Sequence, residues 1–275
     1  MYQLADQAIL SIKGIHSPFL HPHQDLGKLK EFNKIKTMKS LLLFFISITS
    51  LTSFGQKQLV VHDSQAVERP VEKFHSLSVI GLFTVYFSQS DDFKLAISTS
   101  HNGNEDQIKT TVVDGVLRVS RKERIVWGIN SSDRSIKVYV SAPFLKDISA
   151  SGASNINIIG SLRTEALKLT LSGASDFRGT IEAGSIQVDQ SGASDIKMEG
   201  NVHAITLKTS GASDFNGFSL VTDDAVLSAS GASKIQLTVQ KSIKATASGA
   251  SDIEYRGNPE KVGRSSSGAS NISHH

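Results

Sequence analysis

The chain has 275 residues, no cysteine and a formal net charge of +3 at pH 7, with 39% hydrophobic and 20% charged residues. This balance is ordinary for a globular protein with a core. The lack of cysteine excludes disulfides, thiolate metal sites, a thiol nucleophile and a lipid-modified cysteine. The surplus charge lies in the first 55 residues, with six lysines against three acids, so residues 56–275 are net neutral. A neutral body gives no reason to expect nucleic acid as a partner.

The N-terminal segment has the pattern of a secretory signal peptide. Lys34, Lys36 and Lys39 precede an apolar run over residues 40–51, which small residues follow. The run is shorter than the roughly 20 residues that span a bilayer. We therefore predict a signal peptide over residues 38–55, cleaved before Gln56, and an exported protein that is not integral to the membrane. The alternative is a buried apolar helix of a cytoplasmic protein.

Two flanking segments complete the N-terminal organisation. Because a signal peptide normally begins a protein, residues 1–37 are interpreted as a non-native extension from an upstream start codon, with Met38 as the true start. Residues 56–72 are expected to form a linker. The folded domain is then residues 73–275, and export would place it in the periplasm, on the outer surface or in the medium. Without cysteine, the protein is not expected to be a lipoprotein.

The first half of the domain alternates with the period of β-strands. Apolar residues recur at every second position over residues 77–88, interrupted at Gly81, and again over residues 93–97 and 136–140. Residues 108–113 and 116–119 flank Asp114-Gly115, a strong hairpin signal. This half is predicted to consist of short strands without helices.

The second half, residues 151–275, contains seven copies of Ser-Gly-Ala-Ser at intervals of 18 to 21 residues. A unit of this length with two alternating segments cannot bury its apolar face alone, but stacked units pair strand upon strand about 4.8 Å apart. The repeat therefore predicts an all-β fold, a parallel β-helix or β-solenoid with coils of about 19–20 residues. Propeller blades need about 40 residues, and an antiparallel meander would not repeat an identical corner. Glycine turns the chain at each corner, and the seven corner glycines are Gly152, Gly173, Gly192, Gly211, Gly231, Gly249 and Gly268.

A polar residue follows each corner, and stacking would align these residues in a column. The acidic members are Asp176, Asp195, Asp214 and Asp252, with Lys234 between the last two and Asn at both ends. Adjacent carboxylates repel by about 0.8 kcal/mol in water, so the column is expected to face solvent, accept hydrogen bonds or bind cations. Calcium is the sharper hypothesis, but the sequence lacks the Gly-Gly-x-Gly-x-Asp pattern of calcium-binding solenoids. We therefore expect no metal and no cofactor. Polar residues before the last corner predict a terminal coil capped against water.

These features together resemble the auto-transporter adhesin head GIN domain family of exported bacterial proteins. The resemblance covers roughly residues 73–272 and rests on residues 80–87, on residues 113–119 and on the Ser-Gly-Ala-Ser-Asp units. It implies a right-handed parallel β-helix outside the cytoplasm and brings no established catalytic residues.

No catalytic constellation is evident in the sequence. It lacks a His-Glu-x-x-His motif, a Gly-x-Ser-x-Gly elbow and a phosphate loop. The acid pairs Asp91-Asp92 and Asp223-Asp224 are the kind that a solenoid glycosidase uses, but neighbouring acids in loops are usually just solvated. We therefore expect no enzyme.

Basic and aromatic residues supply the candidate ligand contacts. A basic cluster near Trp127 is suited to an acidic polysaccharide or lipopolysaccharide, or it simply deters edge pairing. The candidate contacts are Arg121, Lys122, Arg124, Trp127 and Tyr139, with Tyr255 as a further aromatic.

The leading interpretation is an exported, non-catalytic adhesin or cell-envelope interaction protein. The partner would be a cell-surface glycan, a lipid or an envelope protein. A carbohydrate- or lipid-binding module is the first alternative, and a polysaccharide-active enzyme is the second, since β-helices also host lyases and glycosidases.

Overall fold

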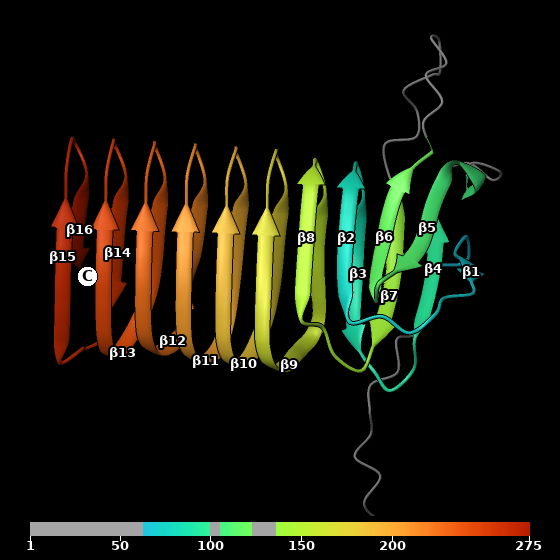
Figure 1. Cartoon of the computed structure of the whole chain (residues 1–275), viewed down its shortest axis with the longest axis horizontal. Helices are drawn as coiled ribbons and strands as arrows, with labels where there is room; N and C mark the ends of the chain where they lie inside the picture. Colours follow the sequence, from blue (N-terminus) through green and yellow to red (C-terminus); the bar gives the residue numbers. More distant parts are fainter. Residues whose placement is uncertain (1–62, 100–104, 123–135) are drawn as a thin grey trace, which may run out of the picture. The chain divides into compact units, whose positions relative to one another are not determined.

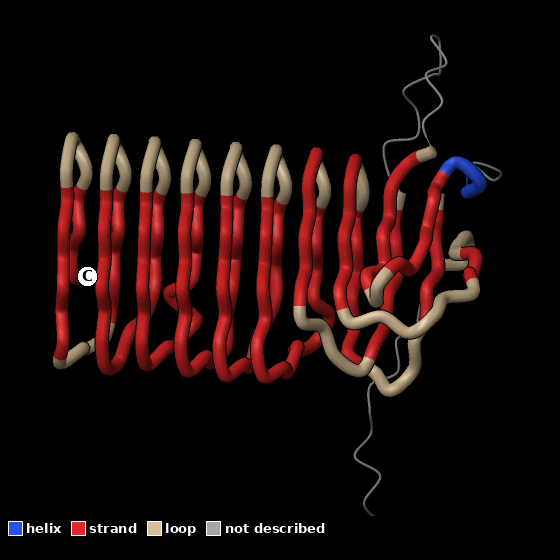
Figure 2. The backbone as a smooth tube through the Cα atoms, in the orientation of Figure 1, coloured by secondary structure: helices blue, strands red, loops and turns tan. Residues whose placement is uncertain are grey.

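The structure, a computed structural model, describes residues 63–99, 105–122 and 136–275. In this part of the chain, 16 strands join in one sheet that winds into a β-solenoid, accompanied by one turn of 3-10 helix, η1 (Glu105–Gln107) (Figures 1 and 2). The predicted all-β parallel solenoid is confirmed. The strands are β1 (Val67–Arg69), β2 (Ser76–Gly81), β3 (Thr84–Gln89), β4 (Lys94–Ser98), β5 (Ile108–Val113), β6 (Val116–Arg121), β7 (Lys137–Ala142), β8 (Asp147–Gly152), β9 (Asn155–Leu171), β10 (Asp176–Gln190), β11 (Asp195–Thr209), β12 (Asp214–Ala229), β13 (Lys234–Ala247), β14 (Asp252–Arg256), β15 (Lys261–Ser266) and β16 (Asn271–His274).

The regular coils are formed by the long strands β9 to β13. Each of these strands starts after one Ser-Gly-Ala-Ser corner, bends at the opposite edge of the coil and ends before the next corner (Figure 2). Neighbouring strands pair in parallel, and because each strand bends midway, the wound sheet has two broad faces. We call the face formed by the first halves of these strands the post-corner sheet and the face formed by the second halves the pre-corner sheet. The predicted column is confirmed by the pairing, which aligns Asn155, Asp176, Asp195, Asp214, Lys234, Asp252 and Asn271.

Departures from the 19-residue interval appear as irregularities in strand pairing. β10 and β11, which are 19 residues apart, pair without a register shift. The longer β9 places Ile158, Ile159 and Gly160 opposite the single residue Gly179 of β10, and Ile159 is 44% exposed. β12 carries extra residues around Phe218 relative to both of its neighbours. Extra residues in one strand of a pair are accommodated as a bulge. Each insertion therefore pushes an apolar residue outward on the post-corner sheet.

The N-terminal coils do not stack in chain order. β2 lies between β6 and β8, and β3 lies between β7 and β9, so the first coil of the chain occupies the second place in the stack (Figure 1). The strands that follow it, β4 and β5, then pair antiparallel with β7 and β6. These reversed strands cover the N-terminal end of the solenoid. The predicted hairpin at Asp114-Gly115 is confirmed, and both of its turn residues have positive φ.

Two details of the N-terminal part correct the sequence interpretation. Gly81 not only interrupts a strand but also forms a corner of the solenoid. Gly152 of the first Ser-Gly-Ala-Ser corner stacks directly on it, and the backbone N–H of Ala153 donates to the Gly81 oxygen at 2.8 Å. The predicted linker, residues 56–72, contains β1, which pairs antiparallel with β4. A strand of three residues is too short to show a period-two pattern, so the sequence alone could not reveal it.

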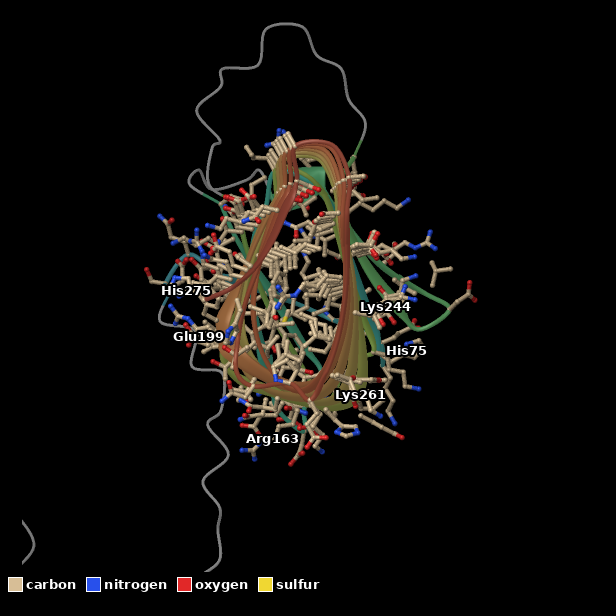
Figure 3. The ribbon with its side chains drawn as sticks, turned by 90° about the vertical axis from the view of Figure 1, so that its left-hand side faces the viewer. His75, Arg163, Glu199, Lys244, Lys261 and His275 are labelled. Carbon is tan, nitrogen blue, oxygen red and sulfur yellow. The ribbon has the colours of Figure 1, made fainter. Side chains whose placement is uncertain are left out.

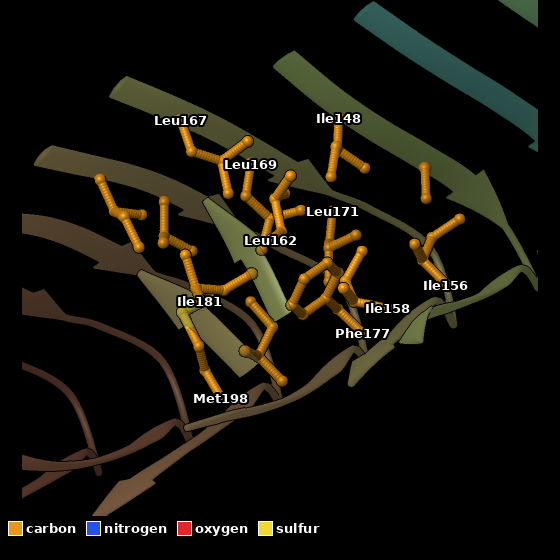
Figure 4. Packing of buried hydrophobic residues seen from close by; sticks show 14 of the residues in the cluster. Ile148, Ile156, Ile158, Leu162, Leu167, Leu169, Leu171, Phe177, Ile181 and Met198 are labelled. Atoms are coloured by element: carbon orange, nitrogen blue, oxygen red, sulfur yellow. The ribbon is translucent and has the colours of Figure 1, made fainter. Parts of the chain in front are cut away.

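The core is a stack of apolar columns inside the coils (Figure 4). One column runs through Val85, Ile156, Phe177, Ile196, Phe215, Ile235 and Ile253, all at most 1% exposed. Side-chain volume is balanced within each coil. Phe177 and Phe215 are each followed two residues later by glycine, whereas Ile196 and Ile235 are followed by Met198 and Leu237. A Cβ at Gly217 would lie 2.5 Å from the Phe215 ring, so the bulky ring and the larger neighbour exclude each other.

The C-terminal end is closed by polar side chains, as the sequence predicted. All residues of β15 are exposed, and Arg264 stands over the Tyr255 ring with its guanidinium 4.9 Å from the ring centroid and donates to the Tyr255 hydroxyl. The His274 ring lies 5.1 Å from the same ring, between centroids. Tyr255 is 2% exposed, so its interpretation as a ligand contact was wrong: the alternation of β14 turns it into the core.

Candidate functional site

The repeated corners are structural, because their polar groups bond within the turn. The second serine of each corner donates its hydroxyl to the carbonyl of the first, at 2.9 Å for Ser175 and Ser194. Both serines are completely buried, as is Ser213. The corner glycines have positive φ, and a Cβ on Gly192 would lie 2.5 Å from the Gly173 oxygen. Seven identical corners are thus explained by turn geometry and close stacking.

The acidic column lies in solvent next to the corners. Asp195, Asp214 and Asp252 are exposed, Asp176 is half-buried, and Lys234 directs its ammonium to Glu254 at 2.9 Å. Among the described residues, no group of three or more His, Cys, Asp or Glu side chains is arranged to hold a metal ion. The structure therefore reduces the repulsion between these carboxylates by exposing them to solvent, which is one of the three arrangements expected from the sequence.

The predicted ligand contacts fall in different places. Arg121 and Lys122 are exposed at the corner end of β6, on the pre-corner side, whereas Tyr139 lies in β7 on the post-corner sheet. Arg124 and Trp127 lie outside the described residues. The structure therefore does not bring Tyr139 into one cluster with Arg121 and Lys122.

Tyr139 instead stacks on Tyr86, a residue that the sequence interpretation did not single out. The two rings are 5.3 Å apart between centroids and 16° from parallel, because β3 and β7 pair with these residues in register. The Tyr139 hydroxyl donates to the Asp63 carboxylate at 3.0 Å, and Lys137 lies 3.4 Å from the same oxygen. Burial and the Asp63 carboxylate raise the pKa of Tyr139 to about 12. Tyr139 is thereby held neutral behind Tyr86.

Asp63 remains charged in this arrangement. Desolvation alone would raise the pKa of Asp63, but hydrogen bonds from Ser98, the Gln65 backbone and Tyr139, together with the Lys137 charge, outweigh it and hold the pKa below its usual range. The Asp63 carboxylate therefore links the first described residues of the chain to β7, and its hydrogen bond to the Tyr139 hydroxyl holds that ring in place against Tyr86.

The free side of Tyr86 borders a shallow groove on the post-corner sheet, which we call the tyrosine groove. It has a volume of about 330 Å³ and spans four neighbouring coils. Tyr86, Asn157, Arg178 and Lys197 occupy successive places in one outward column, so their side chains follow one another along the solenoid axis. The remaining lining residues are Ile158, Ile159, Gly179, Thr180 and Glu199.

The tyrosine groove combines a mostly apolar exposed lining with a few polar and charged side chains. Because Tyr139 covers one face of the Tyr86 ring, the other face is directed toward Asn157 and the groove. The exposed Arg178 guanidinium makes no ion pair with another described residue, whereas Lys197 pairs with Glu199 at 3.5 Å. The bulge at Ile159 adds an apolar rim. The groove thus combines an aromatic face, an amide and an available cation.

The signal for this site in the sequence was indirect. Alternation placed Tyr86 and Arg178 on outward positions, and the 21-residue interval after the first corner marked the bulge. The stacking partner of Tyr86 is 53 residues away, which no local pattern reveals.

The fold and the groove define the class of architecture, a β-solenoid with a shallow groove on one face. The family model described as "Putative auto-transporter adhesin, head GIN domain" matches residues 73–259. The chain belongs to this family.

Solved structures share the fold. A putative adhesin from Bacteroides fragilis is 23% identical, with a TM-score of 0.69 over 78% of this chain and 98% of that chain. A putative lipid binding protein from Parabacteroides distasonis is 17% identical, with a TM-score of 0.59 over 76% of this chain and 96% of that chain. A putative adhesin from Parabacteroides merdae is 16% identical, with a TM-score of 0.57 over 76% and 95% of the two chains. No curated protein matches the sequence. In the described part of the chain, no helix is long and apolar enough to cross a membrane.

Proposed function

We propose that this protein is an exported, non-catalytic adhesin of the cell envelope that binds a glycan in the tyrosine groove. The observation that carries the proposal is the Tyr86 ring in the lining of the groove, next to Asn157 and to Arg178, which forms no ion pair with another described residue. Aromatic faces pack against the apolar faces of sugar rings, and planar guanidinium groups bind carboxylates or sulfates in a bidentate manner. The expected ligand is accordingly a glycan that carries acidic groups.

A purely lipid ligand fits the groove less well. Most of the exposed lining of the groove is apolar, around Tyr86 and Ile159, but the groove is shallow and opens on a flat sheet, so it does not enclose a chain. An acyl chain needs an enclosed apolar cavity for a useful free energy of burial, at about 0.8 kcal/mol per buried CH₂. The Parabacteroides relative with a lipid-binding name shares the fold at 17% identity.

Catalysis is also disfavoured by the lining of the groove. Glycoside hydrolysis ordinarily uses two carboxyl groups about 5–9.5 Å apart across the scissile bond. Glu199 is the single acid among the lining residues, and it is paired with Lys197 at 3.5 Å. Of the two acid pairs that the sequence singled out, Asp223-Asp224 is engaged in other contacts: Asp223 binds His203 and Lys241, and Asp224 accepts from Ser242. Asp91 and Asp92 do not line the groove, and Asp92 pairs with Lys94 at 3.6 Å.

A glycan array with neutral, uronic acid and sulfated oligosaccharides tests this function. Tyr86→Ala and Arg178→Gln should each abolish binding of the acidic ligands, whereas Tyr86→Phe should retain it because the ring face is kept. Arg118→Gln, at an exposed arginine of the pre-corner sheet, is the matched control and should bind as the unmodified protein does. Circular dichroism and urea midpoints verify that each variant is folded.

Binding that survives Tyr86→Ala, or a complete lack of glycan binding, would reject the groove as the site. A reducing-sugar assay on the same samples should show no release of sugar ends. Anionic lipid vesicles, tested in parallel, should not bind in a manner that depends on Tyr86.

A further inference from the structure

A second concave surface lies on the opposite side of the coils, on the pre-corner sheet. Two adjoining grooves of about 620 Å³ and 430 Å³ both include Thr206 in their lining, and together we call them the axial trough. Lys244 and Lys261, which line it, project on one side of the coil cross-section, whereas Glu199 of the tyrosine groove projects on the other (Figure 3). The axial trough is therefore independent of the tyrosine groove.

The strand register determines the direction of the trough. One wall is the outward column Lys168, Gln187, Thr206, Val226 and Lys244, with one residue from each of five successive coils. The floor follows the neighbouring column, whose first three members are the small residues Ala166, Ser185 and Ala204. At about 4.8 Å per coil, the distance from Lys168 to Lys244 is about 19 Å along the solenoid axis. A ligand that fills the trough must therefore be elongated and lie across the strands.

The charges of the trough are concentrated at its two ends. Lys146 and Lys168 line one end, and Lys244 and Lys261 line the other. None of these four lysines forms an ion pair with another residue of the described ranges. The acids that line the trough are Glu165 and Asp224, and Asp147 precedes Lys168 in its column. Hydroxyl and amide groups occupy the middle, namely Ser185, Gln187 and Thr206.

An exposed aromatic ring completes one end. Phe144 is 40% exposed, and the Lys146 ammonium lies over its ring, 5.7 Å from the centroid. This arrangement keeps a cation next to a flat apolar surface, which suits a sugar ring bearing a carboxylate.

From this geometry we propose that the axial trough binds a linear acidic polysaccharide along the solenoid axis. The lysines would pair with the acidic groups of the chain, and the polar middle would bind its hydroxyl groups. A peptide that adds as a strand is disfavoured, because the strands β9 to β13 that form most of the trough are already paired with coils on either side. Among the described strands of the trough, an open sheet edge lies only at its end, on β15, which pairs with β13 alone.

The test uses galacturonic acid oligomers of two, four and six residues, with dextran oligomers as neutral controls, in calorimetric titrations of the full chain. The affinity for the acidic series should rise with oligomer length and fall with added salt, and dextran should not bind. Lys168→Glu and Lys244→Glu should each weaken hexamer binding about fivefold or more, since each replaces an attraction by a repulsion. The matched control is Lys208→Glu, an exposed lysine of the same sheet whose side chain does not line the trough.

An affinity that does not increase with length, or an equal loss in Lys208→Glu, would overturn the proposal in favour of general charge attraction. The Tyr86→Ala variant separates this inference from the proposed function: hexamer binding that depends on Lys168 and Lys244 should persist in it. If Tyr86→Ala removes all binding and the lysine variants remove none, the ligand occupies the tyrosine groove and the trough proposal fails.

Discussion

Gly152 lies directly on Gly81, 71 residues earlier in the chain, and a Cβ on Gly152 would be 2.6 Å from the Gly81 carbonyl oxygen. The same close contact recurs at every following corner, for example between Gly192 and Gly173. The corners therefore form one continuous ladder that joins the irregular N-terminal coils to the regular repeat. The free energy of unfolding should therefore depend on the absence of a Cβ at these glycines.

Gly192→Ala should be strongly destabilising, because the added Cβ meets a backbone oxygen at 2.5 Å and φ is +84°. We expect a loss of about 2–4 kcal/mol in the free energy of unfolding, from backbone strain combined with steric overlap. Gly160→Ala is the control: its φ is +80°, but nothing lies within 4 Å of the added Cβ. It should cost only about 1 kcal/mol. Urea denaturation measures both, and equal losses would contradict the steric role of the ladder.

The packing of Phe215 against Gly217 predicts a coupled pair. Gly217→Ala should cost about 1–3 kcal/mol, because its Cβ would overlap the Phe215 ring at 2.5 Å. Phe215→Leu should cost a similar amount by leaving a cavity. The double variant should lose less than the sum of the two, with a coupling of about 0.5–3 kcal/mol measured by a double-mutant cycle. Additive losses would show that the two positions do not share one volume.

The anchoring of Tyr139 by Asp63 should be visible in the titration of tyrosine. Asp63→Asn should lower the pKa of Tyr139 from about 12 toward 10.0, because the hydrogen bond to a carboxylate and its charge are lost while burial remains. Tyrosine-labelled NMR measures the pKa, and Asp91→Asn, at an exposed acid, is the control. An unchanged Tyr139 pKa in Asp63→Asn would mean that the carboxylate does not hold the phenol.

The same carboxylate predicts how this anchor responds to acid. The pKa of Asp63 lies below its ordinary value of 3.8, so its stabilisation is fully present above that pH and is lost as the pH falls through the lowered pKa. Limited proteolysis with an acid-active protease should therefore cut near residues 63–69 more readily as the pH drops below 3.8. Asp63→Asn should be cut readily at every pH, whereas protection that persists in this variant would assign the anchoring to other contacts.

The leader predicts a defined mature N-terminus. If residues 38–55 are a signal peptide, the exported protein should begin at Gln56, and Edman or mass-spectrometric analysis of the extracytoplasmic fraction should identify this end. Replacing Leu42 and Phe44 by charged residues should retain the protein in the cytoplasm, since the apolar run is what the export machinery recognises. A peptide from residues 1–37 in the precursor would disprove the predicted start at Met38.

The sequence by itself determined the coil architecture, the corners and the alignment of the polar column. These follow from a repeat, because each coil of similar sequence stacks on the previous one and places Asp176, Asp195 and Asp214 at equivalent positions. The apolar alternation likewise separated inward from outward residues. These properties depend on contacts between a residue and its equivalent in the next coil, and the repeat in the sequence shows which residues are equivalent.

Only the tertiary structure decided where the irregular parts belong. The insertion of β2 and β3 between later strands, the role of Gly81 as a corner and the pairing of Tyr86 with Tyr139 all depend on contacts between dissimilar segments far apart in the chain. Local alternation is the same for a strand in any position of the stack, so it cannot specify its partner. The tyrosine groove arises from that partner choice, with a bulge beside it, and the axial trough arises from the register of five coils. The repeat thus defines the scaffold, and nonlocal packing assembles the surfaces proposed to bind ligands.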